Sequence, residues 1–318
     1  MTFSIVAHDP DAGQLGVAVA TCALAAGRAV PWAQAGVGVV TTQAQTNRTY
    51  GARGLQLMQS GLSPRDALDR LLAADRSPAQ RQVAMVSATG EVAAWTGGFC
   101  LSACGHVTGK GFSAQGNTLA SRSVVPSMAE AFTEASGPLA DRLLAALLAA
   151  EEAGGDVRGR QSAALMIVDA EPTDEPWNAI PIDLRVDDHT DPIAELHRLL
   201  ELQRAHEGGD WAALVDSAPA DTRGLYVALD AVRRGDAAAA RGALAELDDQ
   251  PGMDAVMRRM RARTASIRDG SAPTGASRGG SAQGRAATNT PTNAPTPRTA
   301  DSGGVAQPRR AAHAEMAD

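Results

Sequence analysis

This sequence has few lysine and aromatic residues, and its net charge is negative. Lys110 is the only lysine among 29 basic residues, so a mechanism that needs a lysine base has one candidate. Aromatic side chains make up 3% of the 318 residues, so the core has to be built from Ala, Val and Leu. The net charge of −7 argues against nucleic acid or an anionic membrane as a partner.

Cysteine and long apolar runs are scarce as well. Cys22, Cys100 and Cys104 are too few, and odd in number, for a disulfide framework, which favours free thiols in a reducing cytoplasm. Cys100, Cys104 and His106 form a C-x3-C-x-H pattern, whereas zinc sites usually show two spaced pairs. No apolar run reaches the length of a membrane span, and no signal-peptide pattern opens the sequence. We therefore expect a cytoplasmic protein without a metal ion or a cofactor.

The sequence is rich in short strands and amphipathic helices that come in blocks. Strand patterns lie at 2–7, 15–22, 35–45, 82–97, 111–117 and 160–170. Helical periodicity occurs in two pairs, at 50–61 and 63–75 and then at 123–136 and 138–153. Helices grouped around antiparallel-type strands predict an α+β layered sandwich. Neither GxGxxG nor a P-loop occurs between a strand and a helix, so nucleotide binding has little support.

The composition changes twice towards the C-terminus. Residues 191–268 have helical periodicity and predict a small all-α region. From 269 onwards Leu, Ile, Phe, Trp and Tyr are absent, which predicts a disordered tail over 269–318. The acidic stretch 183–189 has the groups to bind a cation, although a turn that ends a first domain at 190 explains it more simply.

Thr2 is the first candidate for chemistry. Methionine aminopeptidases generally remove an initiator methionine when the next residue is as small as threonine, and Thr2 would then carry a hydroxyl and a free α-amine. An α-amine has a pKa of roughly 7.7–8.0, so a useful fraction is neutral near pH 7 and can take the hydroxyl proton. One residue then supplies nucleophile and base. The alternative is that Thr2 is merely the residue after an initiator methionine.

Longer strings within residues 1–190 are more specific. They are TFSIVAHDPDAGQLGVAVAT, VPWAQAGVGVVTTQA, YGARGL, GHVTGKGFSAQGN, GGDVRGRQSAAL and DLRVDDH. In content and order they resemble the bacterial and archaeal domain-of-unknown-function family 1028, which is described as N-terminal-nucleophile (Ntn) hydrolase-like. The resemblance implies a four-layer αββα sandwich in which an N-terminal Thr, Ser or Cys attacks an amide carbonyl. It brings no settled activity and no substrate.

The sequence departs from the proteasome-like pattern of that superfamily at two places. That pattern has an Asp after the second strand and a Lys on the third, whereas this chain has Thr21 and Cys22, then Thr41 and Thr42. Lys110 lies much later in the chain. Either the α-amine of Thr2 acts largely unaided, or the fold is kept without the chemistry.

Several polar residues are candidates to surround Thr2. We expect backbone N–H groups at the end of the third strand to form an oxyanion hole, and Gly-flanked amides and an arginine to bind substrate. Those candidates are Thr42, Gln43, Asn47, Tyr50, Gln115, Asn117, Arg160 and Ser162. Four of them also have a structural interpretation: Asn47 as a helix cap, Gln115 and Asn117 as a capped turn, and Arg160 as a partner of Asp156.

Two functions remain open from the sequence. The first is an amidohydrolase that cleaves a small amide, N-acyl or peptide-like bond through Thr2 and forms a homodimer. The second is a non-catalytic binding or assembly protein, in which 191–268 contacts a protein or a cell-wall glycan. Some relatives carry a C-terminal region described as peptidoglycan-binding, but 191–268 shows no diagnostic motif for it.

Overall fold

The computed structural model describes residues 2–220, 222–245 and 264–265. Strands and helices alternate in blocks along the first two hundred residues. The strands are β1 (Thr2–Asp9), β2 (Gln14–Thr21), β3 (Pro31–Gln34), β4 (Gly38–Ala44), β5 (Arg81–Ser87), β6 (Val92–Thr96), β7 (Gly105–Gly109), β8 (Phe112–Asn117), β9 (Ser162–Asp169) and β10 (Ile182–Val186). The helices are α1 (Thr49–Gln59), α2 (Pro64–Ala74), α3 (Val124–Glu134), α4 (Leu139–Glu152), α5 (Pro192–Gly208), α6 (Trp211–Ser217), α7 (Arg223–Arg234) and α8 (Ala237–Ala245).

Strand β1 lies in the interior of a six-stranded antiparallel sheet. The strand order is β10-β9-β2-β1-β8-β7, so β1 has β2 on one side and β8 on the other. The register pairs Thr2 with Asn117 and Phe3 with Ala20. Thr2 therefore starts a strand that is hydrogen-bonded along both edges, which fixes the position of its main chain.

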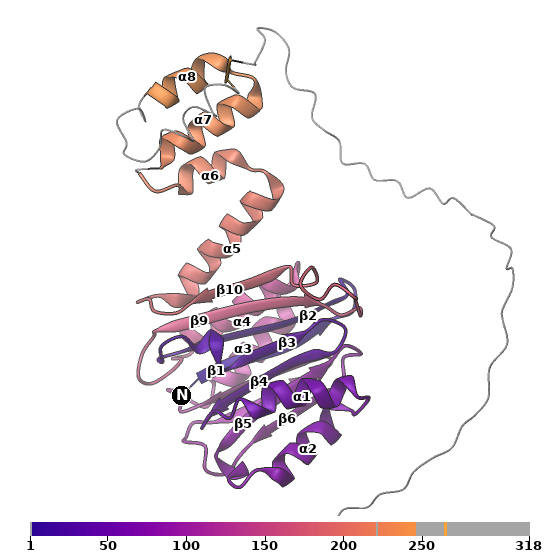
Figure 1. Ribbon diagram of the computed structural model, residues 1–318. Helices are drawn as coiled ribbons and strands as arrows, with labels where there is room; N and C mark the ends of the chain where they lie inside the picture. The colour runs from indigo at the N-terminus through magenta and orange to yellow at the C-terminus, as the bar shows by residue number, and fades with distance from the viewer. Residues whose placement is uncertain (1, 221, 246–263, 266–318) are drawn as a thin grey trace, which may run out of the picture. The chain divides into compact units, whose positions relative to one another are not determined.

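A second, four-stranded sheet packs face to face on the first. Its order is β3-β4-β5-β6, and β4 and β5 contact β1, β2 and β8 across the interface. Helices α1 and α2 cover the outer face of the four-stranded sheet, and α3 and α4 cover the outer face of the six-stranded one (Figure 1). The order of layers is helix, sheet, sheet, helix, and the central strands β1, β2, β4 and β5 are buried on both faces.

The sequence missed three strands of these sheets. It predicted one strand over 35–45, which contains β4; β3 lies just before that range and pairs with β4 in a hairpin, with a turn at Gly36, whose φ of +69° favours glycine. Strand β7 is short and glycine-flanked, with a half-exposed pattern typical of an edge. Strand β10 covers part of 183–189, which was interpreted as a turn; its pairing with β9 is a long-range contact that local composition does not reveal.

Helices α5 to α8 follow β10 in the described chain up to Ala245. Asp191 caps α5 by accepting a hydrogen bond from the backbone of Ala194, and α5 packs on β9 and β10. Arg204 of α5 also pairs with Asp141 of α4 at 2.8 Å. The structure thus has the helices predicted for 191–268 as far as Ala245. The rest of the predicted all-α region, except for 264–265, and the predicted tail over 269–318 lie outside the described residues.

No helix in the described part of the chain combines the length and apolarity that a membrane span requires.

Candidate active site

The interface between the two sheets changes character along its length. Alternate residues of each strand point into it, because side chains on a strand have a period of two. At one end these residues are apolar and form a cluster that includes Val6, Val17, Val39, Val86 and Val168. At the other end the same strands carry buried polar residues: Thr2, Ser4, Thr21, Thr41, Gln43, Gln82, Ser113, Gln115 and Asn117. We call these nine residues the polar layer.

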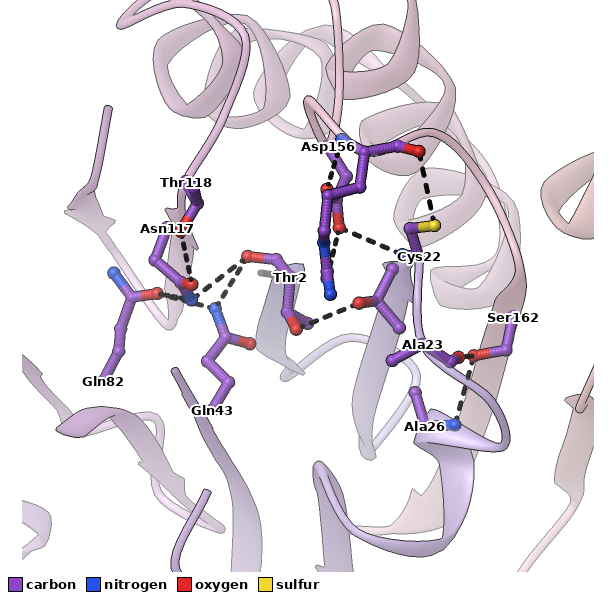
Figure 2. A network of polar contacts seen from close by, with 12 residues as sticks. Thr2, Cys22, Ala23, Ala26, Gln43, Gln82, Asn117, Thr118, Asp156 and Ser162 are labelled. Carbon is purple, nitrogen blue, oxygen red and sulfur yellow. Dashed lines mark hydrogen bonds and ion pairs between the residues drawn. The ribbon is translucent and has the colours of Figure 1, made fainter. Parts of the chain in front are cut away.

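The carbonyl oxygen of Thr2 is bound by two side-chain amides of the polar layer. Gln43 Nε2 donates to it at 3.3 Å and Asn117 Nδ2 at 3.5 Å. Both amides also donate to one acceptor, Gln82 Oε1, at 2.8 Å and 3.0 Å respectively. Figure 2 shows these three side chains converging on one side of Thr2. The first residue of β1 is therefore held by side chains from β4 and β8 as well as by its own sheet.

Gln82 can orient both amides because its own amide group is fixed. Its Nε2 donates to the carbonyl oxygens of Gly116 and Gly105 at 2.8 Å and 3.0 Å and to Thr96 Oγ1 at 3.0 Å. Those acceptors require the nitrogen on that side, so Oε1 has to face Gln43 and Asn117. The side chain is completely buried. An unsatisfied buried amide costs roughly 1–3 kcal/mol, so this orientation is strongly favoured.

Gln115 and Ser4 orient Gln43 from the opposite direction. Ser4 Oγ donates to Gln43 Oε1 at 2.7 Å, and Gln115 Nε2 donates to Ser4 Oγ at 2.8 Å. Gln115 Nε2 also donates to Thr41 Oγ1, and Ser113 Oγ donates to Gln115 Oε1. The carbonyl end of Gln43 is thus engaged by Ser4, which leaves its NH2 group for Thr2 and Gln82. Gln115 reaches Thr2 only through these intermediates.

The hydroxyl of Thr2 points at a second hydroxyl. Thr2 Oγ1 donates to Thr21 Oγ1 at 3.2 Å, and the residue is 6% exposed. A hydroxyl partner can position Oγ1 but is too weak a base to deprotonate it near neutral pH. If Oγ1 is to act as a nucleophile, its base has to be another group.

A charged pair that sequence patterns did not single out lies at the end of β2, next to Thr21, whose hydroxyl accepts from Thr2. Asp156 Oδ2 accepts a hydrogen bond from the backbone N–H of Cys22, the residue after Thr21, at 3.0 Å. The same carboxylate pairs with Arg158 through Nε at 3.2 Å and through a terminal nitrogen at 2.9 Å. In Figure 2, Asp156 and Cys22 lie across Thr2 from Gln43 and Gln82. Asp156 was considered as a partner of Arg160, but the structure pairs it with Arg158.

Asp156 is a buried carboxylate that stays ionised. Burial raises its pKa, but hydrogen bonds from the Arg158 side chain and from the backbone N–H groups of Cys22 and Arg158 outweigh that effect. The net result is a pKa below the ordinary value. The string GGDVRGR, with an Asp and two Arg among glycines, is the sequence signal from which this ion pair could have been found.

Asn47 and Tyr50 belong to a neighbouring cluster rather than to the surroundings of Thr2. Both side chains donate to Asp75 Oδ2, Tyr50 at 3.0 Å and Asn47 at 3.4 Å. Arg81 pairs with the same carboxylate at 2.8 Å and donates to the carbonyl of Gln45 at 2.8 Å. Arg81 holds the pKa of Asp75 well below its usual range, and burial followed by the Asp75 hydrogen bond raises the pKa of Tyr50. The cluster fixes the segment between β4 and α1.

Thr42 and Ser162 bind main-chain atoms. The N–H of Thr42 donates to the carbonyl of Val30 at 3.1 Å, and its hydroxyl donates to the carbonyl of Asn47 at 3.0 Å. An oxyanion hole at this N–H would first have to break the bond to Val30. Ser162 Oγ donates to the carbonyl of Ala23 and accepts from the N–H of Ala26 (Figure 2). It therefore fixes the loop after β2.

Arg160 points to the helices. It pairs with Glu151 of α4 at 2.6 Å and lies 3.7 Å from Asp191, which caps α5. Of the predicted residues, Gln43 and Asn117 contact Thr2 directly. Arg160 contacts neither Thr2 nor Asp156 in the described hydrogen bonds and ion pairs.

All three cysteines are free thiols. Burial raises the pKa of Cys100, and the nearby Cys104 adds to the effect. His106 interacts through Nδ1 with Thr96 Oγ1 at 2.9 Å, not with either cysteine in the described contacts. Within the described residues, His, Cys, Asp and Glu side chains do not gather in groups of three or more that could hold a metal ion.

Comparison with known proteins places the chain in a family. The profile of a family of unknown function (DUF1028) matches residues 2–196, which include every residue of the polar layer. A Silicibacter pomeroyi protein of that family, known from a crystal structure, is similar with 34% identity and a TM-score of 0.59. The match covers 67% of this chain and 93% of the bacterial one. No curated protein matches. The chain therefore belongs to the DUF1028 family.

Proposed function

We propose that this protein is an Ntn-type amidohydrolase in which Thr2, freed by removal of Met1, cleaves a small amide, N-acyl or peptide-like bond. The observation that carries the proposal is the way the main chain of Thr2 is held. Two buried amides bind its carbonyl oxygen, and a hydroxyl on the next strand binds Oγ1. Four layers ordered helix, sheet, sheet, helix also support it, because that is the arrangement of the Ntn sandwich. A nucleophile needs such fixed geometry relative to its base and its substrate.

The first step would transfer the acyl group to the threonine. Thr2 Oγ1 attacks the amide carbonyl carbon while the neutral α-amine of Thr2 takes the hydroxyl proton. The tetrahedral intermediate then collapses: the C–N bond breaks, and the ammonium group returns the proton to the leaving nitrogen. The products are a threonine ester and a free amine. A second step adds water to the ester, the α-amine again accepting and returning a proton, and releases the carboxylic acid.

The polar layer would position the nucleophile rather than carry protons. Gln43 and Asn117 fix the carbonyl of Thr2, which sets the orientation of its Cα and therefore of both its amine and its side chain. Thr21 favours one side-chain rotamer by accepting from Oγ1. Asp156 and Arg158 would place a charged pair near the amine, beside the end of β2, where the proteasome-like pattern has an Asp and this chain has Thr21 and Cys22. Charge near an amine changes its basicity, so this pair would influence the base.

Variants of Thr2 test the proposal with a panel of N-acyl amino acids, primary amides and dipeptides. Thr2→Ala should abolish turnover while leaving the unfolding midpoint close to that of the parent. Alanine also permits removal of Met1, so the variant has the same N-terminus and lacks only the hydroxyl and methyl groups. Thr2→Ser should keep measurable turnover, since serine supplies the same nucleophile. Two extra residues before Thr2 should block turnover by converting the amine into an amide.

Turnover that survives in Thr2→Ala or in the extended protein would refute this mechanism. A chain that hydrolyses no member of the panel in any form would favour the alternative, a non-catalytic binding protein. That alternative predicts that deletion of 191–268 removes a binding partner while the sandwich still folds.

A further inference from the structure

The loop that carries Asp156 and Arg158 passes over the beginning of β1. On one side Asp156 binds the N–H of Cys22, just beyond β2, and Gln161 N–H donates to the carbonyl of Thr21 at 3.0 Å. On the other side Val157 N–H donates to the carbonyl of Thr118, just beyond β8, at 3.5 Å. Because β1 lies between β2 and β8, a loop bound to both flanking strands lies at the end where Thr2 begins.

Arg158 is the solvent-accessible member of its ion pair with Asp156. Its side chain is 38% exposed, whereas that of Asp156 is 1% exposed. Asp156 is itself held by two backbone N–H groups, so it offers the arginine a fixed partner. A guanidinium has five N–H donors in one plane, so an arginine that one carboxylate orients can receive a second. An arginine oriented in advance loses less side-chain entropy when it binds.

We propose that Arg158, oriented by Asp156, binds a carboxylate of the substrate beside Thr2, so that the preferred substrates are amides with a free carboxylate near the scissile bond, such as N-acyl amino acids. The inference deepens the proposed function and rests on it. Arg158 acts here as a specificity residue: it fixes which bond is placed at Oγ1 and takes no part in bond breaking. Bidentate recognition by a planar guanidinium suits a carboxylate better than a neutral ester or amide.

Binding measurements can test this site without turnover. The probes are N-acetylalanine, N-acetylphenylalanine and N-acetylglutamate, each as the free acid and as its methyl ester. The full chain carrying Thr2→Ala binds them without hydrolysis, and ligand-observed NMR gives the affinities. We expect the acids to bind about tenfold more tightly than the esters, since charge-assisted hydrogen bonds are roughly twice as strong as neutral ones.

Arg158→Met, added to Thr2→Ala, should abolish the preference for acids. Arg160→Met is the matched control, because Arg160 is two residues away, is 45% exposed and pairs with Glu151 instead. It should keep the preference. Arg158→Lys keeps the charge without the planar fork and should show an intermediate preference. It also keeps the test decisive if Arg158→Met does not fold.

Three results would overturn the inference: acids that bind no better than esters, a panel in which no acid binds, or an equal loss in Arg158→Met and Arg160→Met. The proposed function is tested separately. If acids bind through Arg158 but no amide is hydrolysed at Thr2, the carboxylate site stands and the amidohydrolase proposal fails. If Thr2-dependent turnover occurs with no preference for acids, the amidohydrolase proposal stands and the carboxylate site fails.

Discussion

Gln43 donates its side-chain amide to Gln82 Oε1 at 2.8 Å, with both side chains completely buried between the two sheets. The two residues face each other across β4 and β5 in the strand register. This single contact joins the group that binds the Thr2 carbonyl to the group that sets its orientation. The position of Thr2 thus depends on a side chain, Gln82, that does not touch it in the described hydrogen bonds.

Gln82→Leu should lower the free energy of unfolding by about 3 kcal/mol or more. The change removes the acceptor of Gln43 and Asn117 and the donor to two glycine carbonyls, and each buried group left unsatisfied costs roughly 1–3 kcal/mol. Urea unfolding measures the loss. Gln80→Leu, at an exposed position two residues earlier, is the control and should change stability by less than about 0.5 kcal/mol. Similar values for both variants would contradict a structural role for the polar layer.

The Asp75 cluster should make stability depend on pH in the acid range. The pKa of Asp75 is lower in the folded protein than in the unfolded chain, because Arg81 and several hydrogen bonds favour the carboxylate. Its contribution is therefore present above the unfolded pKa of about 4 and is lost as pH falls towards the folded value. Asp75→Asn should be less stable at pH 7, and its stability should fall less between pH 5 and pH 2. Parallel profiles for the two proteins would rule out this contribution.

His106 should remain neutral at a pH where a free histidine side chain is half protonated, although part of its ring is exposed. Burial, and then the charge of Arg65, lower its pKa below the ordinary 6.5. Thr96 Oγ1 accepts from Gln82, so its own proton is available for Nδ1, which favours the neutral ring with hydrogen on Nε2. NMR titration of the imidazole carbons should show the low pKa. Thr96→Val removes the donor and should shift the pKa back towards 6.5; an unchanged value would contradict the assignment.

Gly51→Ala should destabilise the protein even though alanine favours helices. A Cβ at Gly51 would collide with the ring of Trp32, which is held by a hydrogen bond from its Nε1 to the Ala29 carbonyl. Overpacking costs roughly 1–3 kcal/mol, more than the gain of up to about 1 kcal/mol in helix propensity. Gly208→Ala is the matched control, since a Cβ at that helical position meets open space and should stabilise slightly. Thermal unfolding should shift in opposite directions for the two variants.

Local sequence patterns predicted the strands and helices well, but they predicted few of the side-chain contacts between them. The strand patterns at 2–7 and 15–22 identified β1 and β2, and the helical periodicity at 63–75 identified α2. Asn117 was found because an amide is unusual in an apolar, glycine-flanked stretch, whereas Gln43 was selected for its backbone N–H and contacts Thr2 through its side chain instead. Gln82 was missed, since only the packing of one sheet on the other turns it towards Thr2. Asp156 contacts Cys22 across 134 residues, a separation that no local pattern can bridge.

The most direct test of the central claim is the intact mass of untagged protein before and after treatment with a β-lactone, followed by peptide mapping. The account predicts loss of Met1 and a single adduct on Thr2, with no adduct on Thr2→Ala. Retained Met1, or a processed Thr2 that does not react, would contradict the account and direct attention to a binding role for the sandwich and the C-terminal helices.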